Sequence, residues 1–164
     1  MSKMLVVYYS WSNGNTKKIA FELAKAKKAD TAAIDTVQPY TGSYNEVVDQ
    51  ALKEVQRGFK PAIKTLDKNL ADYDTIAIGT PTWWYTMAPA VKTFLEDNDF
   101  SGKTVIPFMT NAGWPGHVIK DMTQTLKEKG ANVIAPMEVK FDSNGGDTQE
   151  TSQKKIDQWI ESIQ

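Results

Sequence analysis

The sequence predicts an α/β protein built on a doubly wound, five-stranded parallel sheet with helices on both faces. Two observations carry this prediction. Short apolar runs alternate five times with longer segments whose apolar residues recur at helical spacing. The first run, MLVVYYS (4–10), is apolar almost throughout, as expected for a strand that is covered on both faces. No linker or shift of composition divides the 164 residues, so we expect a single domain over residues 1–164.

Each expected strand is a short run rich in β-branched or aromatic residues. The five strands are expected at 4–10, 31–37, 75–80, 103–110 and 131–139. The helices that follow them are expected at 16–28, 44–57, 87–97, 116–130 and 152–163. In the last helix, Ile156, Trp159, Ile160 and Ile163 recur at i, i+3, i+4 and i+7, which places them on one face.

Two further details follow from helix chemistry. In 44–57 the helical spacing of Val48, Leu52 and Val55 predicts the buried face. Pro89 is compatible with the helix over 87–97 only in its first turn, because proline has no N–H and clashes with the preceding turn. Residues 59–73 are expected to form a loop with one short helical turn.

Composition excludes several classes of function. The chain has a net charge of −1 and no cysteine, which rules out disulfides, thiolate catalysis and iron–sulfur ligation. A single histidine, His117, argues against a zinc site. The scattered charges predict neither a nucleic-acid partner nor a membrane partner. With no apolar run of about 20 residues and no signal peptide ahead of the first strand, we expect a cytoplasmic protein.

Three loops should meet at one edge of the sheet. Ligands of open α/β sheets bind beyond the carboxyl ends of the strands, at the point where the strand order reverses. In this chain the rule selects the loops at 10–16, 80–86 and 110–116, which follow the first, third and fourth strands.

The first of these loops is rich in neutral hydrogen-bond donors. Its polar residues are Ser10, Ser12, Asn13, Gly14, Asn15 and Thr16. They lead into a helix N-terminus, where free N–H groups and the helix dipole favour an anion. The loop is therefore a candidate phosphate site without Arg or Lys. The alternative is that the same residues only form a turn and a helix cap.

The second and third loops carry aromatic rings. TPTWWY (80–85) contains Trp83, Trp84 and Tyr85, and TNAGWPG (110–116) contains Trp114. Rings at the ends of neighbouring strands could enclose a flat ligand, each stacked pair contributing about 0.5–1.5 kcal/mol beyond area burial. For each tryptophan the alternative is a place in the core or on a partner-docking surface.

The order of strand, hydroxyl-rich loop, helix and GTPTWWY (79–85) resembles the flavodoxins over essentially the whole chain. Flavodoxins are doubly wound, five-stranded proteins that bind FMN and carry electrons. Their phosphate loop reads T/S-x-T/S-G-x-T. In this chain either Asn13 is inserted before Gly14, which keeps Ser10 and Ser12 as hydroxyls, or Trp11 and Asn13 occupy the hydroxyl positions. The first register is preferred because it keeps three hydroxyls for the phosphate.

The resemblance implies a set of cofactor contacts. Trp83 would stack on one face of the flavin and Trp114 on the other, and the Trp84–Tyr85 peptide would lie beside flavin N5. The residues implied in FMN binding are Ser10, Trp11, Ser12, Asn13, Gly14, Asn15, Thr16, Pro81, Thr82, Trp83, Trp84, Tyr85, Thr110, Asn111, Ala112, Gly113 and Trp114. No side chain need be catalytic, since the flavin supplies the redox chemistry.

The leading functional hypothesis is therefore an FMN-binding electron carrier that docks to redox partner proteins, a reductase and an acceptor. The alternative is an FMN-dependent NAD(P)H:quinone oxidoreductase. Two departures from the family favour it: no glycine lies between Gly79 and Met87, where a peptide flip would support one-electron chemistry, and the net charge is small. The sequence leaves the oligomeric state open.

A third functional hypothesis is a response-regulator-like or other non-flavin binding module on the same fold. It would need carboxylates after the first strand to hold Mg²⁺, and residues 8–16 contain none.

Two features lie near the expected site. His117, one turn into a helix near the expected flavin edge, could tune the flavin or donate a proton, or it could be an exposed or capping residue. The segment at 142–147 is expected to be a turn-rich connection beside the cofactor rim.

Overall fold

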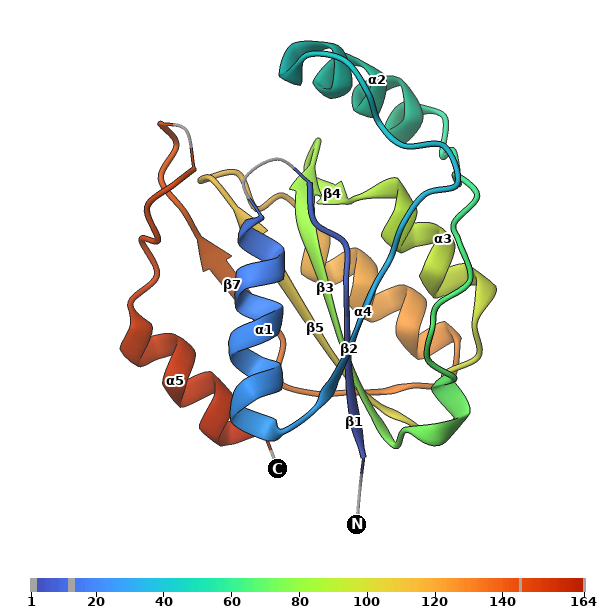
Figure 1. Cartoon of the computed structure of the whole chain (residues 1–164), viewed down its shortest axis with the longest axis vertical. Helices are drawn as coiled ribbons and strands as arrows, with labels where there is room; N and C mark the ends of the chain where they lie inside the picture. Colours follow the sequence, from blue (N-terminus) through green and yellow to red (C-terminus); the bar gives the residue numbers. More distant parts are fainter. Residues whose placement is uncertain (1–2, 12–13, 145, 164) are drawn as a thin grey trace.

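The protein is described by a computed structural model of the whole chain, apart from residues 1–2, 12–13, 145 and 164. Its sheet has the strand order β2-β1-β3-β5-β6, in which the chain starts inside the sheet and extends first to one side and then to the other (Figure 1). The predicted α/β fold with a doubly wound parallel sheet is confirmed. Among the described residues, no helix is both long and apolar enough to cross a bilayer.

The elements follow one another in alternation. The strands are β1 (Met4–Tyr8), β2 (Asp30–Ala33), β3 (Thr75–Trp83), β4 (Thr86–Met87), β5 (Thr104–Asn111), β6 (Asn132–Val133) and β7 (Met137–Lys140). The helices are α1 (Asn15–Lys27), α2 (Tyr44–Gln56), α3 (Pro89–Asp97), α4 (Val118–Glu128) and α5 (Gln153–Ser162). The short helical turn expected within 59–73 is a 3₁₀ turn at Leu70–Asp72.

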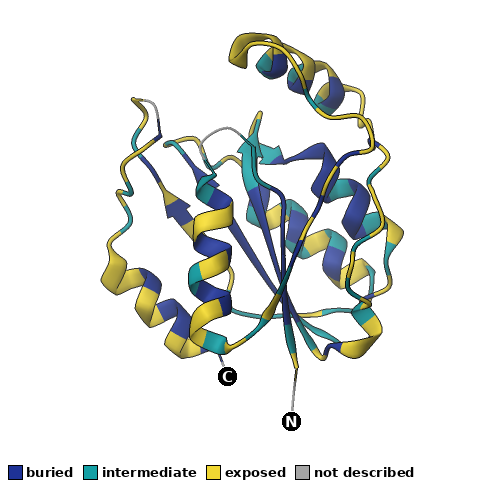
Figure 2. Ribbon diagram, in the orientation of Figure 1, coloured by how far each residue is buried: buried dark blue, intermediate teal, exposed yellow. Residues whose placement is uncertain are grey.

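Two apolar cores lie on opposite faces of the sheet (Figures 1 and 2). One core joins the sheet to α3 and α4 and includes Phe94, Leu95 and Met122. The other joins it to α1 and α5 and includes Ile19 and Leu23. Four of the five helices therefore cover the two faces, as the sequence predicts.

The remaining helix, α2, lies beyond the carboxyl ends of the strands rather than on a face of the sheet (Figure 1). Its buried residues are Val47, Ala51 and Glu54, and none of them belongs to either core. The predicted buried face of Val48, Leu52 and Val55 is only half-buried. The periodicity correctly predicts a helix, but its packing surface is shifted by one residue because the sheet face is not its partner.

The expected strand at 131–139 is broken into β6 and β7. Both pair with β5 in parallel, but Val105 lies opposite Val133 whereas Phe108 lies opposite Met137. The edge strand therefore contains one additional residue, as in a β-bulge. The break falls at Ala135, whose φ of 47° is left-handed and whose carbonyl accepts a 2.7 Å hydrogen bond from the indole N–H of Trp159.

The third strand is longer than predicted. It continues past residue 80 to Trp83, turns at Trp84 and Tyr85, and pairs back on itself through Thr86 and Met87. The helix expected from residue 87 begins only at Pro89, which occupies the first turn. The second strand, by contrast, ends at Ala33 instead of residue 37, after which Thr36 pairs with Ile63 outside the sheet.

Candidate functional site

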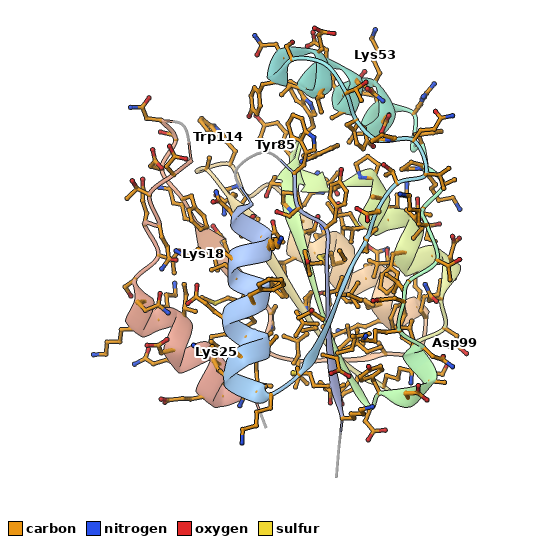
Figure 3. The ribbon with its side chains drawn as sticks, in the orientation of Figure 1. Lys18, Lys25, Lys53, Tyr85, Asp99 and Trp114 are labelled. Atoms are coloured by element: carbon orange, nitrogen blue, oxygen red, sulfur yellow. The ribbon has the colours of Figure 1, made fainter. Side chains whose placement is uncertain are left out.

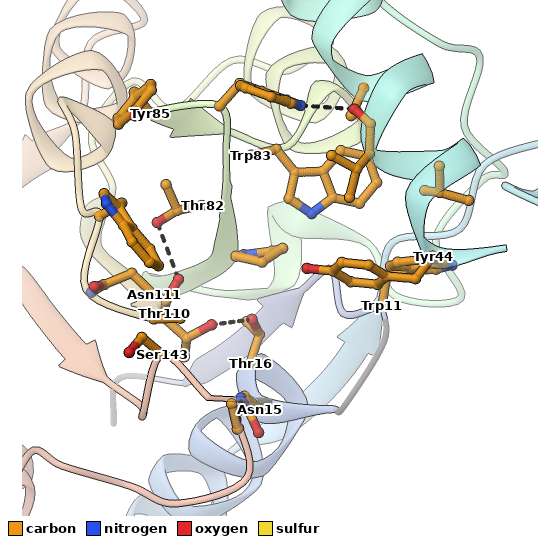
Figure 4. Close-up of a pocket in the computed structure, with 18 residues that line it drawn as sticks. Trp11, Asn15, Thr16, Tyr44, Thr82, Trp83, Tyr85, Thr110, Asn111 and Ser143 are labelled. Atoms are coloured by element: carbon orange, nitrogen blue, oxygen red, sulfur yellow. Dashed lines mark hydrogen bonds between the residues drawn. The ribbon is translucent and has the colours of Figure 1, made fainter.

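A cavity of about 660 Å³ opens at the carboxyl edge of the sheet (Figure 4). The three loops selected from the sequence converge on it, which confirms their predicted proximity. Helix α2 and the segment before α5 complete its walls. Its volume lies within the range of about 300–1,000 Å³ that is typical of small-molecule sites.

Most of the residues expected in the site line this cavity. They are Trp11, Asn15, Thr16, Pro81, Thr82, Trp83, Trp84, Tyr85, Thr110, Asn111, Ala112 and Trp114. Ser10, Gly14 and Gly113 lie in the same loops but outside the lining. Ser12 and Asn13 fall outside the residues that the structure describes, so the register of the phosphate loop around Asn13 stays a prediction.

The polar end of the cavity is organised around Thr110. Its hydroxyl is 2.8 Å from the hydroxyl of Thr16, and both residues are buried. Its carbonyl accepts a 3.1 Å hydrogen bond from the Thr82 hydroxyl. The Asn15 amide donates to the Gly146 carbonyl at 2.7 Å, which ties the start of α1 to the segment before α5. Neutral donors from three separate loops are thereby held within one small region.

The start of α1 adds backbone donors to this end. Its N-cap residue, Gly14, has a φ of 75° and no side chain with which to accept from the first N–H groups of the helix. A Cβ at Gly14 would meet nothing within 4 Å, so the space around it is open. The Ser10 hydroxyl accepts a long hydrogen bond of 3.4 Å from the N–H of Lys17. The N-terminus of α1 thus keeps the character of an anion site.

Trp83 forms one aromatic wall, and three other rings pack edge-on against it. Tyr9, Trp11 and Tyr40 contact it edge-on, with centroid distances of 5.7, 6.2 and 5.0 Å. Tyr40 is itself fixed by a 2.6 Å hydrogen bond to the carboxylate of Glu54. Burial and this hydrogen bond raise the pKa of Tyr40, so its hydroxyl remains a donor to Glu54 well into the alkaline range. The orientation of the Trp83 ring is therefore fixed without any ligand.

The turn after Trp83 has an unusual backbone. Both of its central residues, Trp84 and Tyr85, have left-handed φ values, 51° and 70°. Two-residue hairpin turns of this kind normally use Gly, Asn or Asp, and each bulky residue in such a conformation costs on the order of 1–3 kcal/mol. Backbone strain of this size persists only where surrounding contacts determine the conformation.

Those contacts come from helix α2 and from the loop before α4. The indole N–H of Trp84 donates to the carbonyl of Val48 in α2 at 2.8 Å. The backbone N–H of His117 donates to the carbonyl of Tyr85, also at 2.8 Å. Gly116 packs directly under the turn, since a Cβ built there would lie 2.2 Å from the Tyr85 carbonyl oxygen. The turn therefore has no glycine of its own and is held by α2 and by the closely packed loop before α4.

His117 supports the turn rather than lining the cavity. It is the N-cap residue of α4, and its Nδ1 is 2.5 Å from the carboxylate of Asp121. The same carboxylate oxygen accepts a 2.6 Å hydrogen bond from the hydroxyl of Thr86, on the return strand of the hairpin. The His117 side chain makes no cap hydrogen bond, so of the alternatives considered the structure favours an exposed residue that anchors Asp121 beneath the hairpin.

Trp114 stands at the rim of the cavity with 58% of its surface exposed, and Tyr85 with 50% (Figure 3). The loop that carries Trp114 is closed by the side chain of Asn111, which accepts a 2.7 Å hydrogen bond from the N–H of Gly113. Gly113 therefore contributes to the conformation of this loop without lining the cavity.

Sequence reasoning missed part of the cavity wall. The residues are Tyr44, Val47, Val48 and Ala51 of α2. The spacing 44, 47, 48, 51 is that of one helix face, but the sequence does not show that this face lies over the sheet edge. Ser143 and Gly146 also line the cavity, which agrees with the expected proximity of the segment 142–147. None of the described residues that line the cavity is charged.

The family model described as flavodoxin matches residues 3–163. The chain belongs to the flavodoxin family. Its structure is similar to that of a flavoprotein from Lactobacillus acidophilus NCFM in complex with FMN, with a TM-score of 0.72 and 26% identity over 97% of this chain and 99% of that one. It also shares its fold with flavodoxin 2 of Bacillus cereus, with a TM-score of 0.61 and 16% identity over 98% and 94% of the two chains.

Curated relatives carry the name of an enzyme. The chain is 40% identical to NAD(P)H dehydrogenase (quinone) 3 of Rhizobium meliloti over 101 residues, which are 58% of this chain and 43% of that protein. It is 31% identical to NAD(P)H dehydrogenase (quinone) of Cupriavidus metallidurans over 99 residues, 58% of this chain and 46% of that protein. The similarity therefore spans less than half of the length of these relatives.

Proposed function

We propose that this flavodoxin-family chain binds FMN in the cavity and uses it as its redox centre. The observation that carries the proposal is that one cavity combines neutral donors at a helix N-terminus with tryptophan rings on its walls. FMN requires both features, because it joins a phosphate to a planar heterocycle. The Lactobacillus flavoprotein in complex with FMN supports the assignment.

The residues present fit this cofactor. Asn15, Thr16 and the first N–H groups of α1 would hold the phosphate, together with the hydroxyls of Ser10 and Ser12 that the sequence predicts there. Thr82 and Thr110 offer polar groups between the phosphate end and the aromatic end. Trp83 and Trp114 would flank the ring. The flavin supplies the exchange of electrons, and the protein supplies binding, orientation and exclusion of water.

We further propose that the chain is an oxidoreductase that passes two electrons from NAD(P)H to a quinone. In the balanced reaction, NAD(P)H gives up a hydride, which delivers two electrons and one proton to the quinone, and a second proton is taken up from solution. The products are NAD(P)⁺ and a hydroquinone. The names of the curated relatives and the firmly held Trp84–Tyr85 turn support this proposal.

A second candidate is an electron carrier that docks to a reductase and to an acceptor protein. The exposed rings of Trp114 and Tyr85 at the rim favour it, since exposed aromatic surface is typical of docking sites. In that case the flavin would exchange electrons through the rim, and the chain alone would turn over no small substrate.

One experiment separates the candidates. The purified chain is titrated with FMN while the visible absorbance and fluorescence of the flavin are recorded, and the loaded protein is then mixed with NADH or NADPH and menadione. We expect stoichiometric FMN binding and steady consumption of the nicotinamide by the chain alone. Turnover only after a separate flavodoxin reductase is added would favour the carrier. Failure to bind FMN would overturn both.

A further inference from the structure

Helix α2 presents one apolar face to the cavity. The four residues on it are Tyr44, Val47, Val48 and Ala51, which we call the α2 wall. Val47 is 1% exposed and Ala51 is 3% exposed, although neither packs into a core on the sheet. The opposite side of the helix carries exposed Asp49 and Lys53, and Figure 3 shows Lys53 directed away from the molecule.

The α2 wall faces the tryptophans of the hairpin (Figure 4). The ring of Tyr44 stacks on that of Trp11, with a centroid distance of 5.9 Å and an interplanar angle of 22°. The indole N–H of Trp84 reaches the carbonyl of Val48 and fixes the hairpin against the helix. This end of the cavity is therefore bounded by rings and aliphatic groups.

The chemistry of the two ends differs. The polar end contains hydroxyls and amides for a phosphate and its linker, whereas the α2 wall offers a single side-chain donor, the hydroxyl of Tyr44. The indole N–H of Trp84 is already used by Val48. Because no described lining residue is charged, an ionised group placed at this wall would be desolvated without a counter-charge.

We infer that the α2 wall, together with Trp83 and Trp84, binds the electron acceptor, and that it selects planar, uncharged acceptors over charged ones. This inference rests on the proposed function and names the substrate class of the same site. Ala51 and Val48 then act as specificity-determining residues, because they limit the space between the helix and the hairpin rings.

The test measures binding directly. FMN-loaded, oxidised protein is titrated by calorimetry with menadione and with 1,4-naphthoquinone-2-sulfonate, and FMN affinity is measured separately. We expect the sulfonate to bind at least about tenfold more weakly than menadione, since its charge finds no partner at the wall. Ala51→Phe fills the sub-site and should weaken menadione binding at least about tenfold, with FMN affinity unchanged within about twofold.

Two further variants complete the design. Lys53→Phe adds the same ring to the outer side of α2 and should leave both affinities unchanged. Val48→Ala adds no bulk and keeps the backbone carbonyl that Trp84 uses, so it gives an answer even if Ala51→Phe fails to fold. The loss of two methyl groups should weaken menadione binding about three- to tenfold.

The outcomes that overturn the inference are distinct. If Ala51→Phe weakens FMN as strongly as menadione, the α2 wall belongs to the cofactor. If the two quinones bind equally, or if neither Ala51→Phe nor Val48→Ala affects menadione, the wall does not select the acceptor; in all these cases FMN binding, and with it the proposed cofactor, stands. A chain that takes up no FMN overturns the proposed function and this inference together.

Discussion

Gly116→Ala tests whether the loop before α4 determines the shape of the Trp84–Tyr85 turn. Gly116 has a φ of 56°, and a Cβ on it would lie 2.2 Å from the carbonyl oxygen and 2.4 Å from the Cα of Tyr85. Both atoms belong to the backbone, so no side-chain rotation relieves the overlap. Either the turn or the loop has to move by about an ångström to restore an ordinary contact.

The expected loss of stability has three parts. The left-handed conformation costs any L-residue about 1–2 kcal/mol. The overlap adds about 1–3 kcal/mol, as for other overpacked sites. Displacement of Tyr85 weakens its 2.8 Å hydrogen bond with the N–H of His117, for about 0.5–1.5 kcal/mol more. Together these give roughly 2.5–6.5 kcal/mol for Gly116→Ala.

Gly102→Ala provides a matched control. Gly102 has a φ of 76°, but a Cβ there would meet nothing within 4 Å, so only the conformational cost of about 1–2 kcal/mol applies. Urea unfolding followed by circular dichroism gives both free energies of unfolding. FMN affinity should fall in Gly116→Ala alone, because Tyr85 lines the cavity. Equal losses of stability in the two variants would refute the role assigned to the close packing.

Three further predictions concern single side chains. Thr16→Ala should weaken FMN more than riboflavin in fluorescence titrations, because its hydroxyl lies at the proposed phosphate end; equal losses would contradict this role. Trp84→Phe removes the hydrogen bond to Val48 and should cost about 0.5–1.5 kcal/mol in urea unfolding, whereas an unchanged midpoint would mean that the contact does not hold the hairpin. The 2.6 Å hydrogen bond to Asp30, and then burial, raise the pKa of Tyr73 to about 12 from the 10 of a free tyrosine, so its stabilising contribution is complete below pH 10 and is lost as the pH rises toward 12. Tyr73→Phe should therefore lose less stability than the unmodified chain between pH 10 and 12 in circular dichroism, and identical alkaline profiles would argue against this linkage.

The site could be predicted from the sequence to the extent that strand ends determine it. Once β1, β3 and β5 are recognised as parallel neighbours, their carboxyl ends must lie at one edge, and Thr16, Trp83 and Thr110 are brought together by that rule alone. The same rule says nothing about helices that leave the sheet. Tyr44, Val47, Val48 and Ala51 were therefore missed, although their spacing was visible.

Local sequence patterns also do not predict the left-handed backbone of the hairpin turn. Trp84 and Tyr85 are poor residues for a left-handed turn, and their intrinsic preferences point to a longer strand instead. The turn forms because Val48, Gly116 and His117, from two other parts of the chain, hold it in place. Such contacts depend on distance in space rather than on distance along the sequence.

Periodicity and strand connectivity are properties of the chain, so the order of the elements, the doubly wound sheet and the ligand-binding edge can be predicted from the residues alone. The position of α2, the bulge between β6 and β7, and the conformation of the Trp84–Tyr85 turn become apparent only in the folded molecule. Each of these three features depends on packing between segments far apart in the chain, whose free energy outweighs the local preference of the residues involved.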